Sequence, residues 1–278
     1  MLLPLFYVDD IIRAALREDI NYLDVSTAYV IPENQRSEAR FVAKADGVLC
    51  GIEVAFRVFQ LLDDSFAGEM LKKDGDEIHK GELLATFRGK TALLLQGERT
   101  ALNLLQHMSG VATATHAAVH AIEGTGASIA ETRKTLPGLR ALQKYAVTCG
   151  GGRNHRFNLS DAAMLKDNHI DAGGGITSTV ALLRSKIGHT VRVEVETRNM
   201  EEVREALAAG ADIIMLDNMT PDEMREACTF LAGRAVTEAS GNVTLENVRA
   251  VARAGVDIIS MGALTHSVRA MDISMRIG

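Results

Sequence analysis

Residues suited to anion chemistry gather at strand-to-loop junctions in the second half of the chain. The segment CGGGRNHR at residues 149–156 combines three glycines with Arg153, His155 and Arg156. Planar guanidinium groups bind carboxylates and phosphates through paired hydrogen bonds. Glycine lets the backbone pass close to a ligand, because no side chain occupies that space. The segment is therefore typical of an anion-binding loop.

Six short apolar segments nearby end in ionic or glycine-bearing groups. They are SIAETRKT, AAMLKDNH, VRVEVET, ADIIMLDN, RAVTEASGN and VDIISMGA. The polar or glycine residues at or just after their ends are Glu131, Arg133, Lys134, Lys166, Asp167, Asn168, His169, Glu194, Glu196, Asp217, Asn218, Glu238, Ser240, Gly241, Asn242, Gly262 and His266. In parallel α/β barrels catalytic groups collect at the carboxyl ends of the strands. Cations beside carboxylates at one rim predict a highly anionic substrate bound with Mg²⁺.

Two glycine-bearing turns predict where a phosphate binds. ASGN at residues 239–242 and the turn at Gly262 offer bare backbone N–H groups near helix starts, and His266 follows the second turn. Such N–H groups suit phosphate, and barrels commonly hold a phosphate at their last two strand loops. Glu196 and Asp217 end the two preceding strands, where sugar hydroxyls or metal-bound water would lie. A phosphorylated sugar is the substrate class that this order favours.

The elements that must position these residues alternate between strands and helices. MEEVREALAAG, PDEMREACTFLAG and TLENVRAVARAG have helical spacing and separate the later strand candidates. This alternation predicts βαβ units and a parallel sheet. Six strands are too few for a closed eight-stranded barrel, so we expect an α/β fold with an incomplete, open parallel barrel.

The first part of the chain has a different pattern. Residues 8–19 and the segment IEVAFRVFQLLDD read as amphipathic helices, whereas ARFVAKADGVLCG and MLKKDGDEIHKGELLATFRG read as strands with Asp-Gly turns. We expect an α+β sandwich domain of residues 1–104, rejoined by the C-terminal segment 268–278, and a barrel domain of residues 105–267. The boundary falls in a helix near residues 92–109, and its exact place there stays open.

Composition excludes several classes of function. Among 278 residues, 30 Lys and Arg face 36 Asp and Glu, and this net charge of −6 argues against general affinity for nucleic acid or anionic membrane. No apolar run approaches a membrane span, and the opening MLLPLFYV lacks the basic start of a signal peptide. Cys50, Cys149 and Cys228 have no CxxC spacing, so we predict neither a disulfide framework nor a zinc site. A reducing cytoplasm fits best, and burial is the expected state of Cys149.

A resemblance follows from these motifs. The segment ETRKTLPGLRALQKYAVTCGGGRNHRFNLSDAAMLKDNHI resembles the signature region of the quinolinate phosphoribosyltransferase family. ALREDINYLDVST, GERTALNLLQHMSGVAT, VEVET, MLDN, EASGN and GALTHS resemble further stretches of that family in the same order. The resemblance thus covers nearly the whole chain, and the combination of TRKT-PG, GGG-NHR and KDNH is specific.

The resemblance implies a reaction and its participants. Quinolinate and phosphoribosyl pyrophosphate would give nicotinate mononucleotide, pyrophosphate and CO₂, with Mg²⁺, as a step of NAD biosynthesis. Arg133 and Arg156 would bind the two carboxylates, and the resemblance brings Arg99 to them from the neighbouring subunit of a homodimer. Lys134 and Lys166 would bind pyrophosphate. Glu196 and Asp217 would hold ribose hydroxyls or Mg²⁺, directly or through water. The remaining expected substrate-binding residues are His155, Ser240, Gly241, Asn242, Gly262 and His266.

Simpler interpretations stand beside these. A single Arg or Lys is by default a solvated surface charge, and only the grouping at strand ends favours function. His155, His169 and His266 could be structural histidines, and Glu194 could support its neighbours. Two alternative functions remain: a relative of the same fold associated with molybdate transport, and a non-catalytic phosphosugar-binding domain.

Overall fold

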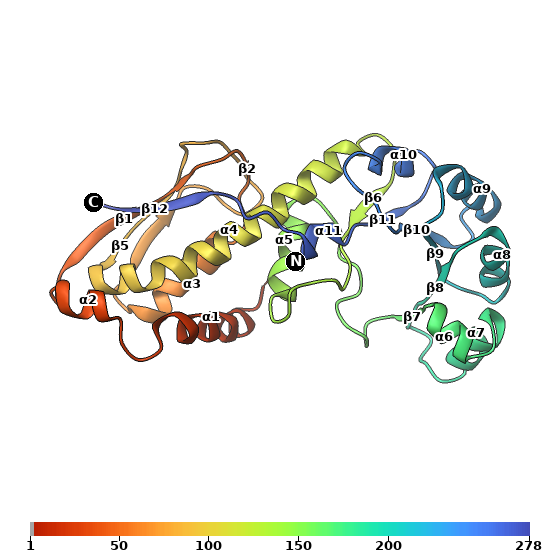
Figure 1. Cartoon of the computed structure of the whole chain (residues 1–278), viewed down its shortest axis with the longest axis horizontal. Helices are drawn as coiled ribbons and strands as arrows, with labels where there is room; N and C mark the ends of the chain where they lie inside the picture. Colours follow the sequence, from red (N-terminus) through yellow and green to blue (C-terminus); the bar gives the residue numbers. More distant parts are fainter. Residues whose placement is uncertain (1–2) are drawn as a thin grey trace. The chain divides into compact units, whose positions relative to one another are not determined.

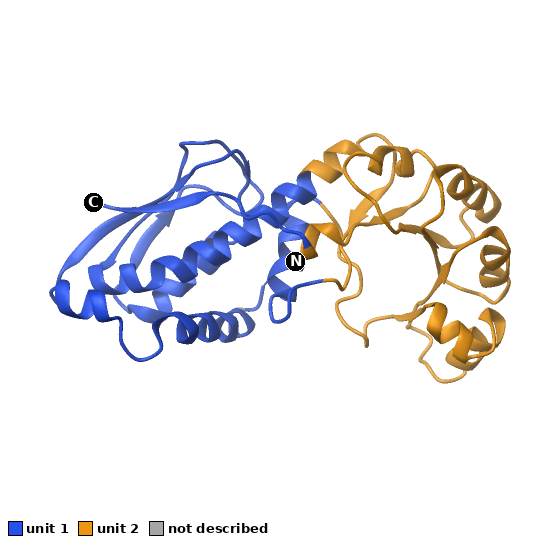
Figure 2. Cartoon of the chain, in the orientation of Figure 1, with its two compact units in different colours: residues 1–116, 135–151, 267–278 blue, residues 117–134, 152–266 orange. Residues whose placement is uncertain are grey.

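The computed structural model describes residues 3–278, which form two compact units (Figure 2). Unit 1 comprises the residues up to His116 together with residues 135–151 and 267–278, and unit 2 comprises residues 117–134 and 152–266. The C-terminal segment therefore groups with the first unit. Residues 135–151, which the sequence assigned to the barrel domain, also group with unit 1.

Unit 2 is built on a six-stranded sheet. The strands are β6 (Ser128–Ala130), β7 (Ala163–Leu165), β8 (Val193–Thr197), β9 (Ile213–Asp217), β10 (Val236–Ser240) and β11 (Ile258–Ser260). Their order is β6-β11-β10-β9-β8-β7, and every neighbouring pair is parallel. β6 and β7 stand at the two edges, so the barrel is open (Figure 1). The predicted incomplete α/β barrel is confirmed.

The helices of unit 2 have buried residues, apart from α6 (Asp167–Ala172), which has none. The others are α7 (Ile176–Arg184), α8 (Met200–Ala208), α9 (Pro221–Leu231), α10 (Val248–Ala252) and α11 (Ala263–His266). α9 starts where its sequence says it should, because Thr220 and Glu223 form a reciprocal capping box and Pro221 occupies the first turn. Figure 1 shows α8, α9 and α10 along the outer side of the curved sheet, which leaves the strand ends for the site.

Unit 1 has an antiparallel sheet with helices. Its elements are α1 (Leu5–Ile20), α2 (Val25–Val30), β1 (Arg36–Ala43), β2 (Gly47–Val48), α3 (Ile52–Leu62), β3 (Ala67–Met70), β4 (Glu77–Ile78), β5 (Leu83–Lys90), the first part of α4 (Thr91–Ala121), α5 (Arg140–Cys149) and β12 (Ile273–Ile277). The four-stranded order is β12-β1-β5-β3, so the C-terminal strand pairs with the first strand of the chain. No helix in residues 3–278 is long and apolar enough to cross a membrane.

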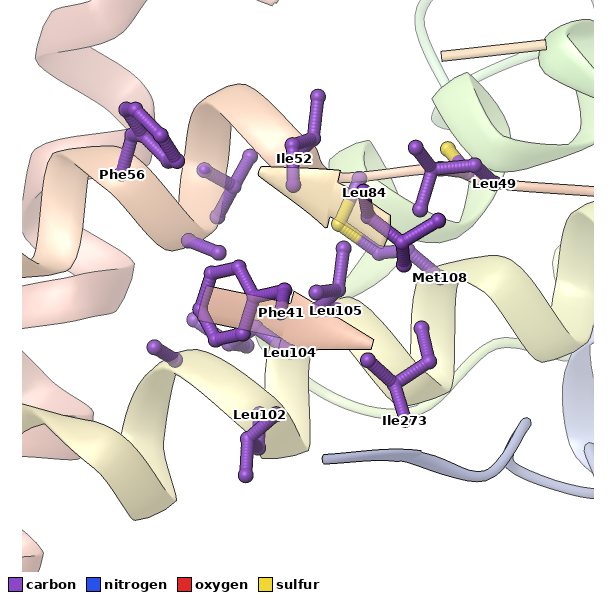
Figure 3. Close-up of a cluster of buried hydrophobic side chains, with 14 of the residues drawn as sticks. Phe41, Leu49, Ile52, Phe56, Leu84, Leu102, Leu104, Leu105, Met108 and Ile273 are labelled. Carbon is purple, nitrogen blue, oxygen red and sulfur yellow. The ribbon is translucent and has the colours of Figure 1, made fainter. Parts of the chain in front are cut away.

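The core of unit 1 explains why the C-terminal segment returns. Phe41 of β1 is fully buried, and its ring lies 4.8 Å from that of Phe87 on β5. Figure 3 shows Phe41 among Leu105, Met108 and Ile273, side chains from α4 and β12. Each large apolar side chain buried in this way stabilises the fold by about 1.5–3 kcal/mol.

A glycine of α4 makes the approach of the C-terminal segment possible. A Cβ at Gly110 would lie 2.3 Å from the carbonyl oxygen of Arg269. Next to this contact, the N–H of Met271 donates to the carbonyl of Gln106 at 2.9 Å. The backbone of the segment therefore occupies the space that a side chain would need.

We expect Gly110→Ala to lower the free energy of unfolding by about 1–3 kcal/mol, since overpacking forces backbone to shift. Gly188→Ala is the matched control, because a Cβ there meets nothing within 4 Å. Urea unfolding of both variants measures the difference. Equal stability of the two would show that the segment does not pack against Gly110 in solution.

Candidate active site

A cavity of about 570 Å³ opens at the carboxyl ends of the strands in unit 2, within the range of small-molecule sites. Its walls are mostly polar or charged. The lining residues are Thr132, Arg133, Lys134, His155, Arg156, Met164, Lys166, Glu196, Met215, Asp217, Asn218, Glu238, Ser240, Gly241, Asn242 and Ser260. Most of these residues lie at the ends of the six strands or in the loops after them, and His155 and Arg156 come from the loop between α5 and β7.

The guanidinium side of the cavity is built at the edge strands. The N–H of Arg153 donates to the carbonyl of Ile129 at 2.8 Å, which ties the loop after the glycines to β6. Arg156 is then held by its own contacts, with Nη1 donating to the carbonyl of Ala162 at 3.0 Å. Burial lowers the pKa of Arg156, and the charge of Arg133 lowers it further. Two guanidinium groups close enough to repel each other predict an anionic ligand between them.

His155 lies between two buried carboxylates. Its Nε2 is 3.4 Å from Glu194 Oε2 and 3.4 Å from Glu238 Oε1, and its backbone N–H donates to Glu131. Burial disfavours the imidazolium, but hydrogen bonding and charge from Glu194 and Glu238 outweigh it and raise the pKa of His155 to about 10. The sequence had left a structural role open for His155 and Glu194, and the structure joins them in one cluster.

The proton of this cluster is shared. The N–H of Arg156 donates to His155 Nδ1 at 2.7 Å, which favours a hydrogen on Nε2 and opposes a second one on Nδ1. Burial also raises the pKa of Glu194, whose Oε1 is buried without a hydrogen-bond partner within residues 3–278. The His155 ring therefore carries a hydrogen on Nε2, which faces the carboxylates of Glu194 and Glu238.

The carboxylate side of the cavity faces Lys166. Glu196 on β8 receives a hydrogen bond of 3.1 Å from Lys166 Nζ, and Asp217 at the end of β9 receives one of 2.7 Å from Asn218. Glu194 lies two residues before Glu196 and points to the same side of β8, because side chains alternate along a strand. Glu194 is the deeper of the two and does not line the cavity.

The loop after β10 is shaped by a required glycine. Gly241 has φ +93°, and a Cβ there would lie 2.3 Å from Asn218 Oδ1. The side chains of Asn242 and Asn218 hydrogen-bond at 3.1 Å, so the loops after β9 and β10 hold each other. This arrangement leaves bare backbone at the rim, as a phosphate site needs.

The last loop supports Lys134. A Cβ at Gly262 would approach Lys134 Cδ and His266 Cδ2 to 3.1 Å, and Thr265 Oγ1 donates to the Lys134 carbonyl at 2.9 Å. Gly262 and His266 thus lie beside Lys134 without lining the cavity.

The structure brings together most of the predicted site residues. Those that line the cavity are Arg133, Lys134, His155, Arg156, Lys166, Glu196, Asp217, Ser240, Gly241 and Asn242. Arg99 lies exposed on α4 in unit 1. Met164, Met215 and Ser260 also line the cavity and were not predicted from the sequence. Met215 could have been found, since it precedes Asp217 by two residues on β9 and so faces the same way.

Fold and site define the class: an open α/β-barrel protein with an anion-binding cavity at the carboxyl ends of its strands. Two family models match the chain. The C-terminal domain of quinolinate phosphoribosyl transferase matches residues 111–276, and the N-terminal domain matches residues 24–109. The chain belongs to the quinolinate phosphoribosyltransferase family.

Individual relatives agree with this. A probable nicotinate-nucleotide pyrophosphorylase (carboxylating) of Bacillus subtilis is 47% identical over 260 residues, 94% of this chain and 90% of the relative. A chloroplastic nicotinate-nucleotide pyrophosphorylase (carboxylating) of Arabidopsis thaliana is 44% identical, over 99% of this chain and 84% of the relative. The crystal structure of NadC from Streptococcus pyogenes is 42% identical, covers 100% of this chain and 99% of its own, and has a TM-score of 0.96.

The His155 cluster predicts how stability depends on pH. His155 has a higher pKa in the folded protein than in the unfolded chain, so its protonation stabilises the fold. This contribution to the free energy of unfolding is complete below the pKa of the unfolded chain, about 6.5, and is lost as pH rises through about 10. Glu238→Gln removes one carboxylate, so the pKa of His155 falls. The free energy of unfolding then decreases less steeply with pH. The difference in slope is on the order of 1 kcal/mol per pH unit.

Urea unfolding between pH 6 and 10 measures this, with the exposed Glu246→Gln as the control. Parallel curves for the parent and Glu238→Gln would contradict the shared proton.

Proposed function

We propose that the chain transfers the phosphoribosyl group of phosphoribosyl pyrophosphate to quinolinate with decarboxylation. The products are nicotinate mononucleotide, pyrophosphate and CO₂, and the step belongs to NAD biosynthesis. One observation carries the proposal: in a chain of this family, a single cavity is lined by two guanidinium groups, two lysines and three carboxylates, those of Glu196, Asp217 and Glu238. The relatives named above are carboxylating nicotinate-nucleotide pyrophosphorylases.

Quinolinate recognition rests on charge and shape. Its two adjacent carboxylates lie on a flat ring, and each can pair with one planar guanidinium, Arg133 or Arg156. A bound dianion also relieves the repulsion that lowers the pKa of Arg156.

The transfer step depends on charges that are already in place. Positive charge develops at the anomeric carbon of the ribose while pyrophosphate leaves. Glu196 and Asp217 stabilise the positive charge on the ribose, and Lys134 and Lys166 stabilise the negative charge of the departing pyrophosphate. Both pairs therefore act most strongly in the transition state. The Lys166–Glu196 contact of 3.1 Å holds the two side chains in the cavity before substrates arrive.

The residues of the cavity also fit Mg²⁺. This ion prefers oxygen ligands and is bound through one or two carboxylates plus substrate phosphates. Glu196 and Asp217 supply such oxygens, directly or through water, and both carboxylates are only partly buried. When bound, Mg²⁺ neutralises charge on the pyrophosphate.

Decarboxylation then requires little further chemistry from the protein. Once the ring nitrogen carries the ribose it is a pyridinium, and this cation stabilises the electron pair left on the ring carbon when the neighbouring carboxylate departs as CO₂. That carbon then takes up a proton from water, which gives nicotinate mononucleotide. The guanidinium that holds that carboxylate must not bind it too tightly, because bond breaking removes its negative charge. Arg156 is suited to this, since its other contacts already hold it.

Neither alternative function is favoured by the site. A molybdate-transport relative or a phosphosugar-binding domain does not need two carboxylates opposite two guanidinium groups. Titration calorimetry with quinolinate and with molybdate distinguishes these functions, and a turnover assay with quinolinate tests the reaction itself.

Neutral replacement of the carboxylates tests the mechanism. Glu196→Gln and Asp217→Asn keep size but remove the charge that opposes the developing cation, so we expect turnover to fall about 100- to 1,000-fold even at saturating Mg²⁺. Quinolinate binding alone should barely change, since a carboxylate does not attract a dianion. Glu226→Gln on α9, whose side chain is 61% exposed, is the control. Turnover near that of the parent in both variants would leave these carboxylates with a structural role only.

We further propose a homodimer with shared active sites, because Arg99 has an assigned role only if it reaches a cavity of the partner. Mixing Arg99→Ala with Lys166→Ala chains should then restore part of the activity, since one hybrid site has both residues intact. Mixing Lys134→Ala with Lys166→Ala should restore none, because both residues belong to the same cavity. No recovery in the first mixture, once hybrid dimers are shown to form, would contradict shared sites.

A further inference from the structure

A second cluster of reactive side chains lies in unit 1, which does not contain the cavity. Cys50, between β2 and α3, and Cys149, the last residue of α5, come together with Asp74. The two sulfur atoms and a carboxylate oxygen all lie within 4.8 Å of one another. No CxxC spacing exists in the chain, so tertiary structure alone creates this pair of thiols.

Asp74 is already committed to hydrogen bonds. Its Oδ1 accepts from the N–H groups of Gly51 and Ile52 at 2.9 and 3.0 Å, at the start of α3. Tyr145, one turn before Cys149 on α5, also hydrogen-bonds to this carboxylate. A metal ion would have to compete with these donors for the only hard ligand of the cluster. The two thiols are therefore the reactive groups of the cluster.

The two thiols are not equivalent. Cys50 is completely buried, whereas Cys149 is partly exposed. Hydrogen bonds from Cys50 and Tyr145 lower the pKa of Cys149 against the effect of burial, while burial raises the pKa of Cys50 well above its usual value. Cys149 is therefore the thiol that solvent reaches and that more readily forms the reactive thiolate.

We propose that Cys50 and Cys149 form a redox-active dithiol, which a hydroperoxide converts into an intramolecular disulfide. The two sulfur atoms lie within 4.8 Å of each other and must approach to about 2.05 Å to form the bond. The proposal does not rest on the phosphoribosyl transfer, and its test needs no enzyme activity.

The oxidation proceeds in two balanced steps. The Cys149 thiolate attacks one oxygen of the hydroperoxide, the O–O bond breaks, and the other oxygen leaves with a proton as an alcohol or water. Cys149 is then a sulfenic acid. The Cys50 sulfur attacks the Cys149 sulfur, the S–O bond breaks, and hydroxide leaves as water with the Cys50 proton. Two thiols lose two electrons, and the peroxide gains them.

Cys228 provides an internal comparison. It lies on α9 in unit 2, is partly exposed like Cys149, and hydrogen-bonds to Thr237. Burial raises the pKa of Cys228, and no second cysteine of the described residues 3–278 accompanies it in a cluster. Exposure alone would make Cys149 and Cys228 react alike, whereas the dithiol makes Cys149 react faster.

The experiment treats the reduced full-length protein with hydrogen peroxide, blocks the remaining thiols by alkylation and maps the cysteine peptides by mass spectrometry. We expect a cross-linked Cys50–Cys149 peptide, two hydrogen masses lighter than its parts and reversible by dithiothreitol. Cys149 should react at least about tenfold faster than Cys228. Cys50→Ala, an apolar replacement suited to the buried position, should leave a Cys149 sulfenic acid that dimedone traps.

Cys228→Ser is the matched control and should form the same cross-link as the parent. Three results would overturn the proposal. They are equal reactivity of Cys149 and Cys228, oxidation of Cys149 to a sulfinic acid without a cross-link while Cys50 is present, and a stoichiometric Zn²⁺ in the reduced protein that is lost in Cys149→Ser. The last result would make the cluster a metal site.

Discussion

Parallel pairing of the six strands in unit 2 is the constraint on which the active site depends. The carboxyl ends of parallel strands all lie at the same edge of the sheet, so residues far apart in the chain reach one rim. Lys134, Lys166 and Asp217 follow three different strands and still line one cavity. The helices on the outer side bury the apolar face and leave this rim to the loops. Function in this fold is therefore carried by a few positions at each strand end.

The charged groups of the site differ in how deeply they are buried. The cations and the carboxylates at the rim are partly exposed, where substrate and solvent can compete for them. Below them, Glu194 and Glu238 are buried around His155 and raise the pKa of its imidazole to about 10 against the effect of burial. Such preorganised charges cost little reorganisation during a reaction, because folding has already fixed them. Burial of the cluster costs folding free energy, and the same burial fixes its charges in place.

Unit 1 shows a different use of burial. Its sheet closes only when β12 returns from the end of the chain, and Gly110 permits the backbone of that segment to cross α4. The core around Phe41 then includes side chains from both ends of the sequence. The pairing of Cys50 with Cys149 is a further product of this packing, since α5 belongs to the same unit.

The sequence by itself determined the class of the fold and the identity of most site residues. Apolar strands and amphipathic helices alternate visibly after residue 128, and each strand carries its polar group at the same end, because local periodicity and strand direction are written in neighbouring residues. Eight of the ten predicted residues that line the cavity follow from that rule, whereas His155 and Arg156 belong to the glycine-bearing loop before β7.

Tertiary structure decided what depends on distance between segments. It buried Glu194 below Glu196, although both stand in one short motif, and it placed Gly262 and His266 behind Lys134 instead of in the cavity wall. It also grouped residues 135–151 with unit 1 and made two distant cysteines neighbours. None of these could be read from the sequence, because the depth of a side chain and the partner of a segment are set by packing between elements, which no local pattern records.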